Sequence, residues 1–159
     1  MVEAPSKIVD RFAAAGANLI TIHCEVGERE IRRAIAGIRS QGCAVGMALR
    51  LDTPVAALAP YVSSLDAVVL MGTELGVKGK ALAASACERI GELGALHESV
   101  SRRSRMPIIA DGGIRKETVP LLREAGADAI VPGSLVFQAG GLEDVFRWIH
   151  AVGGKGAPG

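Results

Sequence analysis

The sequence predicts an α/β fold in which a parallel sheet is covered by helices. Short, nearly continuous apolar runs alternate with segments of helical periodicity along the chain, as in proteins built from βα units with right-handed crossovers. Two of these runs end abruptly. One ends at Asp111-Gly112-Gly113 and the other at Gly133-Ser134. Both an open doubly wound sheet and an eight-stranded barrel fit this alternation.

Each apolar run follows small or turn-forming residues, which mark the end of the preceding segment. Examples are Ala15-Gly16-Ala17 before the first run and Ala125-Gly126-Ala127 before the last. The runs are short and apolar throughout, as expected of parallel strands that are buried on both faces. We therefore expect strands at 18–24, 43–49, 66–72, 107–111 and 128–132.

The segments between the runs carry helical patterns. Ile31, Ile35 and Ile38 form a stripe spaced by three and four residues among charged side chains, which predicts an amphipathic helix. Thr53 and Pro54 suit the N-cap and the first position of another helix. We expect helices at 5–15, 28–40, 54–62, 82–102, 116–125 and 141–152, so that one helix precedes five βα units.

Length and composition predict a single domain over residues 1–152 and exclude several functions. The chain has 159 residues, 49% of them apolar, and the tail 153–159 is expected to be flexible. A net charge of +1 with three Phe, one Trp and one Tyr argues against nucleic acid. No apolar run approaches the roughly 20 residues of a membrane span, and no signal peptide is visible. We therefore expect a cytoplasmic protein with Cys24, Cys43 and Cys87 as reduced thiols.

The loop after the predicted strand 66–72 is the first of three strand ends that suit a phosphate. Gly76 and Gly79 can turn backbone N–H groups toward an anion, and Lys78 or Lys80 adds positive charge. The alternative is an ordinary surface loop with solvated lysines. Glycine spacing in this loop does not decide between the two.

The other two strand ends are Asp111-Gly112-Gly113 and Gly133-Ser134. Asp111 alternatively caps the next helix or bonds within a tight turn, and Ser134 alternatively is the N-cap of a short helix. Parallel strands place all their carboxyl ends on one face, where ligands bind in such folds. We therefore expect the three ends to form one phosphate site with an acid beside it.

Polar residues also follow the first predicted strand. His23 ends that strand, and we expect a hydrogen-bonded histidine that faces inward; a metal or proton-transfer role stays open, since one histidine makes no metal site. Glu25 is interpreted either as a carboxylate at the rim or as a solvated charge. His97 and His150 fall in predicted helices and are expected at the surface.

Several segments together resemble one known family. They are Met1-Val2-Glu3, Ile22-His23-Cys24-Glu25, Met71 to Lys80, Asp111-Gly112-Gly113-Ile114, and Val131-Pro132-Gly133-Ser134 with Phe137. At this spacing the chain is similar to the ribulose-phosphate 3-epimerase family from its first residue to about Phe146. The resemblance favours the barrel over the open sheet. It implies a partial TIM-type (β/α) barrel of about five βα units preceded by a helix, matching strands 4 to 8 of the family.

The resemblance also implies a ketose-phosphate 3-epimerase. In this reaction a proton is removed from carbon 3 beside the ketone and returned to the opposite face, while a divalent metal (Zn, Fe, Mn or Co) stabilises the enediolate. Asp111 is then a metal ligand and one of two acid/base aspartates. The implied sugar-phosphate contacts are Gly76, Val77, Lys78, Gly79, Gly112, Gly113, Gly133 and Ser134.

The chain departs from the family pattern as well. The family's serine, His-x-Asp pair and a histidine before Met1 are absent, so we expect a truncated form that is inactive as it stands. Sheet edges left open by five strands favour a homo-oligomer. Glu74-Leu75 and Lys78 replace family residues, which favours another pentulose or hexulose phosphate. The alternatives are a non-catalytic phosphate-binding half barrel or pseudoenzyme that needs a partner chain, and a related sugar-phosphate lyase.

Overall fold

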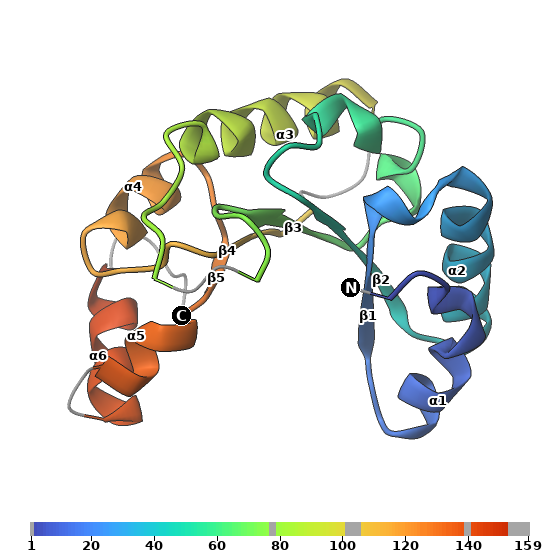
Figure 1. Ribbon diagram of the computed structural model, residues 1–159, viewed down its shortest axis with the longest axis horizontal. Coiled ribbons are helices and arrows are strands. Elements are labelled where there is room, and N and C mark those ends of the chain that lie inside the picture. Colours follow the sequence, from blue (N-terminus) through green and yellow to red (C-terminus); the bar gives the residue numbers. More distant parts are fainter. Residues whose placement is uncertain (1, 77–78, 101–105, 139–140, 153–159) are drawn as a thin grey trace.

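Five parallel strands form one arched sheet in the order β1-β2-β3-β4-β5 (Figure 1). The computed structural model describes residues 2–76, 79–100, 106–138 and 141–152. The strands are β1 (Leu19–His23), β2 (Ala44–Leu49), β3 (Ala67–Met71), β4 (Ile108–Asp111) and β5 (Ala129–Val131). Each strand pairs only with its neighbours in sequence. An open doubly wound sheet needs a point where the strand order reverses, so the sequential order confirms the barrel-type fold.

Helices cover the outer, convex side of this arch (Figure 1). The α-helices are α1 (Val9–Ala14), α2 (Glu28–Ser40), α3 (Ala86–Val100), α4 (Thr118–Glu124), α5 (Gly133–Gln138) and α6 (Leu142–Val152). None of the helices in the described part of the chain is both long and apolar enough to span a membrane. The helix predicted for 28–40 is α2, and its stripe residues Ile31 and Ile38 are buried, as predicted.

The hydrophobic core lies between the helices and the outer face of the sheet. Val45, Met47 and Leu49 alternate along β2 and are fully buried, because every second residue of a strand points to the same face. They pack in one cluster with Ile38 of α2 and Leu93 of α3. Burying one such side chain contributes about 1.5–3 kcal/mol, so this layer fixes the positions of the strand ends.

The inner, concave face of the sheet carries smaller and more polar residues. Thr21 lies beside Gly46, and Gly46 beside Ala67, in the register of β1 to β3. A side chain at position 46 would collide with Thr21, so this part of the face has no space for a larger residue. By the alternation of the strands, His23 and Asp111 both belong to the inner face at its carboxyl end.

Two aspartates act alike at the opposite, amino end of the sheet. Asp66 Oδ2 accepts a hydrogen bond from the backbone N–H of Val45 at 2.8 Å, and Asp128 Oδ2 accepts one from Ile108 at 2.9 Å. Each aspartate precedes its own strand and accepts a hydrogen bond from the beginning of the neighbouring strand. Because a strand's register decides which side chains face the core, these two bonds help place β3 and β5.

The predicted helix at 54–62 is wrong. The chain there forms two 3-10 turns, Val55–Leu58 and Val62–Ser64, and Thr53 does not cap either of them. Its hydroxyl instead donates to Glu25, a partner distant in the sequence. Predicted helix 5–15 is likewise interrupted, and helix 82–102 begins only at Ala86. The tail 153–159 lies outside the described residues.

Candidate functional site

Asp111 is the last residue of β4, and a sharp turn made by two glycines follows it. Gly112 and Gly113 have φ angles of +93° and +70°, which residues with a side chain rarely adopt. The Asp111 side chain is half-buried. Burial raises the pKa of this carboxyl above its ordinary value, and a hydrogen bond from the Gly112 backbone opposes the shift only in part.

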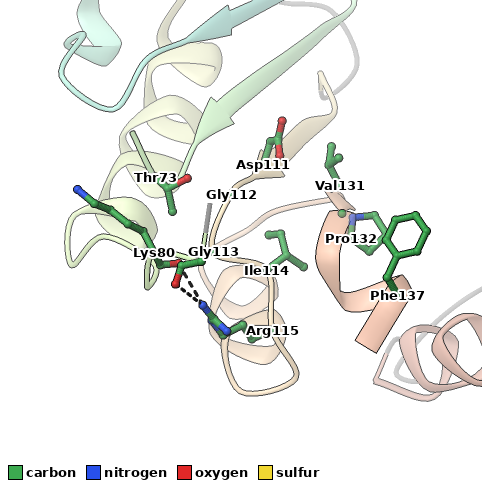
Figure 2. A pocket seen from close by; sticks show the side chains of 12 residues that line it. Thr73, Lys80, Asp111, Gly112, Gly113, Ile114, Arg115, Val131, Pro132 and Phe137 are labelled. Carbon is green, nitrogen blue, oxygen red and sulfur yellow. Dashed lines mark hydrogen bonds between the residues drawn. The ribbon is translucent and has the colours of Figure 1, made fainter. Parts of the chain in front are cut away.

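The glycine turn lines a hollow of about 450 Å³ at the carboxyl ends of β4 and β5 (Figure 2). Figure 2 shows Asp111 on one side of the turn and Arg115 on the other. The lining residues are Thr73, Gly79, Lys80, Asp111, Gly112, Gly113, Ile114, Arg115, Val131, Pro132, Gly133 and Phe137. The site therefore has an acid at one end and a cation at the other, with bare backbone between them.

Gly72, Leu82 and Ala83 form a layer that packs directly on the glycine turn. The backbone N–H of Gly72 donates to the Asp111 carbonyl at 2.6 Å, and the N–H of Ala83 donates to the Gly72 carbonyl at 2.9 Å. An added Cβ at Gly113 would lie 2.7 Å from Leu82 Cα. The absence of a side chain at position 113 thus allows the two segments to meet.

Gly113→Ala is expected to destabilise the protein more than Gly76→Ala, by about 1–3 kcal/mol. Both positions have positive φ angles, so both variants carry the same kind of backbone strain. Only position 113 adds a collision, because nothing lies within 4 Å of a Cβ at position 76. Urea unfolding of the two variants measures the difference. Equal losses of unfolding free energy would show that Leu82 does not pack on the turn.

Two cationic side chains border the hollow. Arg115 Nη2 donates to the carbonyls of Gly79 at 2.8 Å and Lys80 at 3.3 Å, drawn as dashed lines in Figure 2. Lys80 Nζ pairs with Glu74 Oε2 at 2.6 Å, with both side chains largely exposed. An exposed pair of this kind contributes at most about 1 kcal/mol. Arg115 therefore holds the backbone at Gly79 and Lys80 in place and brings positive charge to the hollow, whereas the Lys80 charge is paired with Glu74.

Four of the eight predicted phosphate contacts come together here. Gly79, Gly112, Gly113 and Gly133 all line the hollow beside Asp111. Gly76 does not line it. Val77 and Lys78 lie outside the described residues. Ser134 belongs to α5, which begins at Gly133, so the alternative of a short helix start holds at this strand end, although Ser134 is not its N-cap.

Thr73, Arg115 and Phe137 are lining residues that the sequence did not single out as contacts. Arg115 comes two residues after Gly113, so a cation close to a glycine pair was the available signal. Thr73 lies opposite Gly112, where an added Cβ would collide with its hydroxyl. Phe137 is 90% exposed, which leaves its ring open at the edge of the hollow.

A second polar group lies at the end of β1. His23 Nδ1 and Glu25 Oε2 are 3.0 Å apart, which confirms the expected hydrogen-bonded histidine. Glu25 is not the solvated charge that was one of the two expectations, because its side chain is only 17% exposed. Burial works against its charge, but hydrogen bonds from Thr53, Arg50 and His23 outweigh that effect and lower the pKa of Glu25.

The other two histidines differ in their exposure. His150 is exposed on α6, as expected. His97 is buried, with 8% of its surface exposed, so the expectation of a surface position is wrong. His97 belongs to the buried side of helix α3.

A resident metal ion does not fit the described residues by themselves. Across residues 2–76, 79–100, 106–138 and 141–152, no three His, Cys, Asp or Glu side chains gather in a way that could hold one. Asp111 is the one such residue among those lining the hollow. A single carboxylate is too few ligands for a divalent ion.

Sequential parallel strands with a glycine-lined hollow at their carboxyl ends define a protein of the (β/α)-barrel type. The chain belongs to the ribulose-phosphate 3 epimerase family, whose sequence profile matches residues 1–137. Ribulose-phosphate 3-epimerases of Bacillus subtilis (strain 168) and Treponema pallidum (strain Nichols) are 34% and 36% identical over 137 residues, 86% of this chain. The chain spans 62% of the length of each of these relatives.

Solved structures support the same fold. A 3-hexulose-6-phosphate synthase superimposes with a TM-score of 0.67 at 20% identity, covering 94% of this chain and 68% of that protein. Orotidine 5'-monophosphate decarboxylase from Sulfolobus solfataricus gives a TM-score of 0.66 at 16% identity, covering 92% and 65%. At these identities the likeness shows the fold alone.

Proposed function

We propose that this chain carries the phosphate-binding side and one acid/base group of a ketose-phosphate 3-epimerase. The observation that carries the proposal is the hollow in which Asp111, the glycines 112, 113 and 133, and two cations lie together. Backbone without side chains lets a phosphate approach closely, and the positive charge of Arg115 offsets part of the phosphate charge. Family membership supports a sugar phosphate as the ligand.

The placement of Asp111 suits proton exchange at carbon 3. With the phosphate among the glycines and cations, the carbon chain extends toward the acid at the other end of the hollow. The Asp111 carboxylate takes the proton beside the ketone, which leaves an enediolate, and a second group on the opposite face returns a proton and inverts the carbon. A pKa raised by burial makes Asp111 a better proton acceptor than an ordinary aspartate.

Family membership implies a divalent metal, and we keep Zn, Fe, Mn and Co as the candidates. Asp111 is the described residue placed to contribute a ligand, and the others have to come from outside the described residues. The second acid/base group also lies outside the set of residues that line the hollow.

Proton NMR in D2O tests the epimerase with D-ribulose 5-phosphate, and hexulose phosphates serve as a panel for sugar preference. Loss of the carbon-3 proton signal reports abstraction, and the appearance of the epimer reports return from the opposite face. The chain is assayed alone and together with the barrel segment of the Bacillus subtilis relative that this chain does not match. Exchange with that segment present supports the proposal. Bound ketose phosphate without any exchange in either case would contradict it.

The second candidate is a non-catalytic phosphate-binding half barrel that needs a partner chain. It is favoured by one observation: among the described residues, Asp111 brings a single carboxylate to the hollow, and no second His, Cys, Asp or Glu lines it. Binding without exchange, even with the complementary segment, is the result this candidate predicts.

We also propose that the chain self-associates through the open sheet edges at β1 and β5. Leu19 of β1 and Val131 of β5 are each 41% exposed, and unpaired strand edges favour pairing with another chain. Leu19→Lys and Val131→Lys are expected to weaken association about tenfold or more, since each removes an apolar contact. Light scattering across a concentration series measures this, with Leu121→Lys on α4 as the control. A monomer at every concentration would disprove the proposal.

A further inference from the structure

A chain of hydrogen bonds holds one imidazole at the carboxyl end of β1. We infer that His23 determines sugar specificity: its Nε2 atom accepts a hydrogen bond from a hydroxyl of the ketose phosphate, at the end of the molecule away from the phosphate. This inference rests on the proposed function and adds a contact to the same ligand.

Glu25 fixes which nitrogen of His23 carries the proton. Glu25 Oε2 lies 3.0 Å from His23 Nδ1, so in the neutral ring Nδ1 donates and Nε2 keeps a lone pair. Glu25 Oε1 is already engaged, because it accepts from the Arg50 backbone at 2.9 Å and the Thr53 hydroxyl at 2.5 Å. The carboxylate is therefore held on three sides and holds the ring in one orientation.

Arg89 of α3 anchors the turn that binds Glu25. Its Nη1 donates to the Thr53 carbonyl at 2.7 Å, and its Nη2 donates to the Arg50 carbonyl at 2.9 Å. Arg89 is only 8% exposed, and its Nε finds no partner among the described residues. Burying a guanidinium with one N–H unsatisfied costs stability. An apolar residue would pack there at lower cost, so the arrangement is better explained by precise placement of the imidazole.

The Nε2 atom lies on the ring edge opposite Glu25, and no hydrogen bond to it is formed within the described part of the chain. His23 pairs in register with Ala48, and Ala48 with Val69, on the inner face that also carries Asp111. Three strand spacings of about 4.8 Å separate β1 from β4, or about 14 Å along the sheet. The arch shortens that path on the concave side (Figure 1).

The neighbour of His23 on this face has a small side chain. Ala48 of β2 lies beside His23, and Val69 of β3 lies beside Ala48. A ligand on the concave side can therefore approach the imidazole over Ala48. A polyhydroxylated chain of five or six carbons, anchored by its phosphate near Gly133, presents hydroxyls in that direction.

Calorimetry on the whole chain tests the contact, with D-ribulose 5-phosphate and inorganic phosphate as separate probes. His23→Phe keeps an aromatic ring and removes both nitrogens. It is expected to weaken ribulose 5-phosphate binding about tenfold, the effect of one buried hydrogen bond, while phosphate binding stays unchanged. His23→Gln places an amide near the Nε2 position and should restore part of the affinity. His150→Phe, on exposed α6, is the matched control and should change neither.

Nitrogen-15 NMR of the wild-type imidazole gives a readout that does not depend on a variant. The His23 Nε2 resonance should move on addition of ribulose 5-phosphate and not on addition of inorganic phosphate. Sugar-phosphate binding with an unmoved Nε2 and an unaffected His23→Phe would overturn this inference and leave the proposed function intact. Equal losses for both probes in folded His23→Phe would make the residue structural. A wild-type chain that binds no ketose phosphate would overturn the proposed function and this inference with it.

Discussion

Replacing Asp111 with asparagine is expected to reduce carbon-3 proton exchange at least about 100-fold, the contribution typical of a general acid/base group. Asparagine has nearly the same shape, so the turn at Gly112 and Gly113 should persist. The assay is the loss of the carbon-3 proton of ribulose 5-phosphate in D2O, with the complementary barrel segment present. Asp10→Asn, an exposed change on α1, carries the same change in charge and should leave exchange as it was.

The same variant is expected to be more stable than the wild type at neutral pH. The folded state raises the pKa of Asp111, so it favours the protonated acid. The stabilising effect of that proton is present below the unfolded pKa and is lost as the pH rises through the folded pKa. Asp111→Asn should therefore raise the free energy of unfolding at pH 7, and its advantage should shrink as the pH falls through the range of carboxyl titration. Denaturant melts at several pH values measure it, and an advantage independent of pH would contradict the burial argument.

Gly133→Asp is expected to weaken phosphate binding by about 1–4 kcal/mol, a loss of roughly 5- to 1,000-fold. Nothing lies within 4 Å of a Cβ at this position, so the new Cβ atom itself collides with nothing. Its effect is the repulsion between a carboxylate and a phosphate dianion a few Å apart.

The variant Gly133→Asn separates the effect of the negative charge from the effect of the added side-chain volume. Asparagine fills the same space without the negative charge and should bind inorganic phosphate nearly as the wild type does. Calorimetry with inorganic phosphate and with ribulose 5-phosphate compares the two variants. If Gly133→Asp and wild type bind both probes equally, the phosphate lies elsewhere in the protein.

The strands were predictable because each is a short apolar run between turn residues, and the predicted bounds exceed the observed ones by one or two residues at most. Periodicity did not decide between barrel and open sheet. The family resemblance of the strand-end motifs favoured the barrel, and the sequential order β1 to β5 confirms it. The predicted helix at 54–62 failed because Thr53 bonds Glu25, a residue 28 positions earlier, instead of capping the local turn.

The residues of the candidate site were likewise predictable only where the signal is local in the sequence. Asp111, Gly112, Gly113 and Gly133 were predictable, because a carboxylate or glycine after an apolar run is a local signal. Arg115 was not, since its role depends on carbonyls 35 and 36 residues away. The sequence left open whether Glu25 lies at the rim or in solvent. Its partners Arg50 and Thr53 come later in the chain, and they reach Glu25 only when β1 and β2 pair.

The two aspartates at the amino end of the sheet, Asp66 and Asp128, affect how the chain folds. Asp66 bonds a residue 21 positions away and Asp128 bonds one 20 positions away, and every strand pairs with its neighbour in sequence. Such a topology has a low contact order for a β-containing protein, because no loop longer than one βα unit has to close before a strand finds its partner. Folding can then proceed by adding one unit at a time to a growing sheet, with each aspartate aligning the unit it introduces.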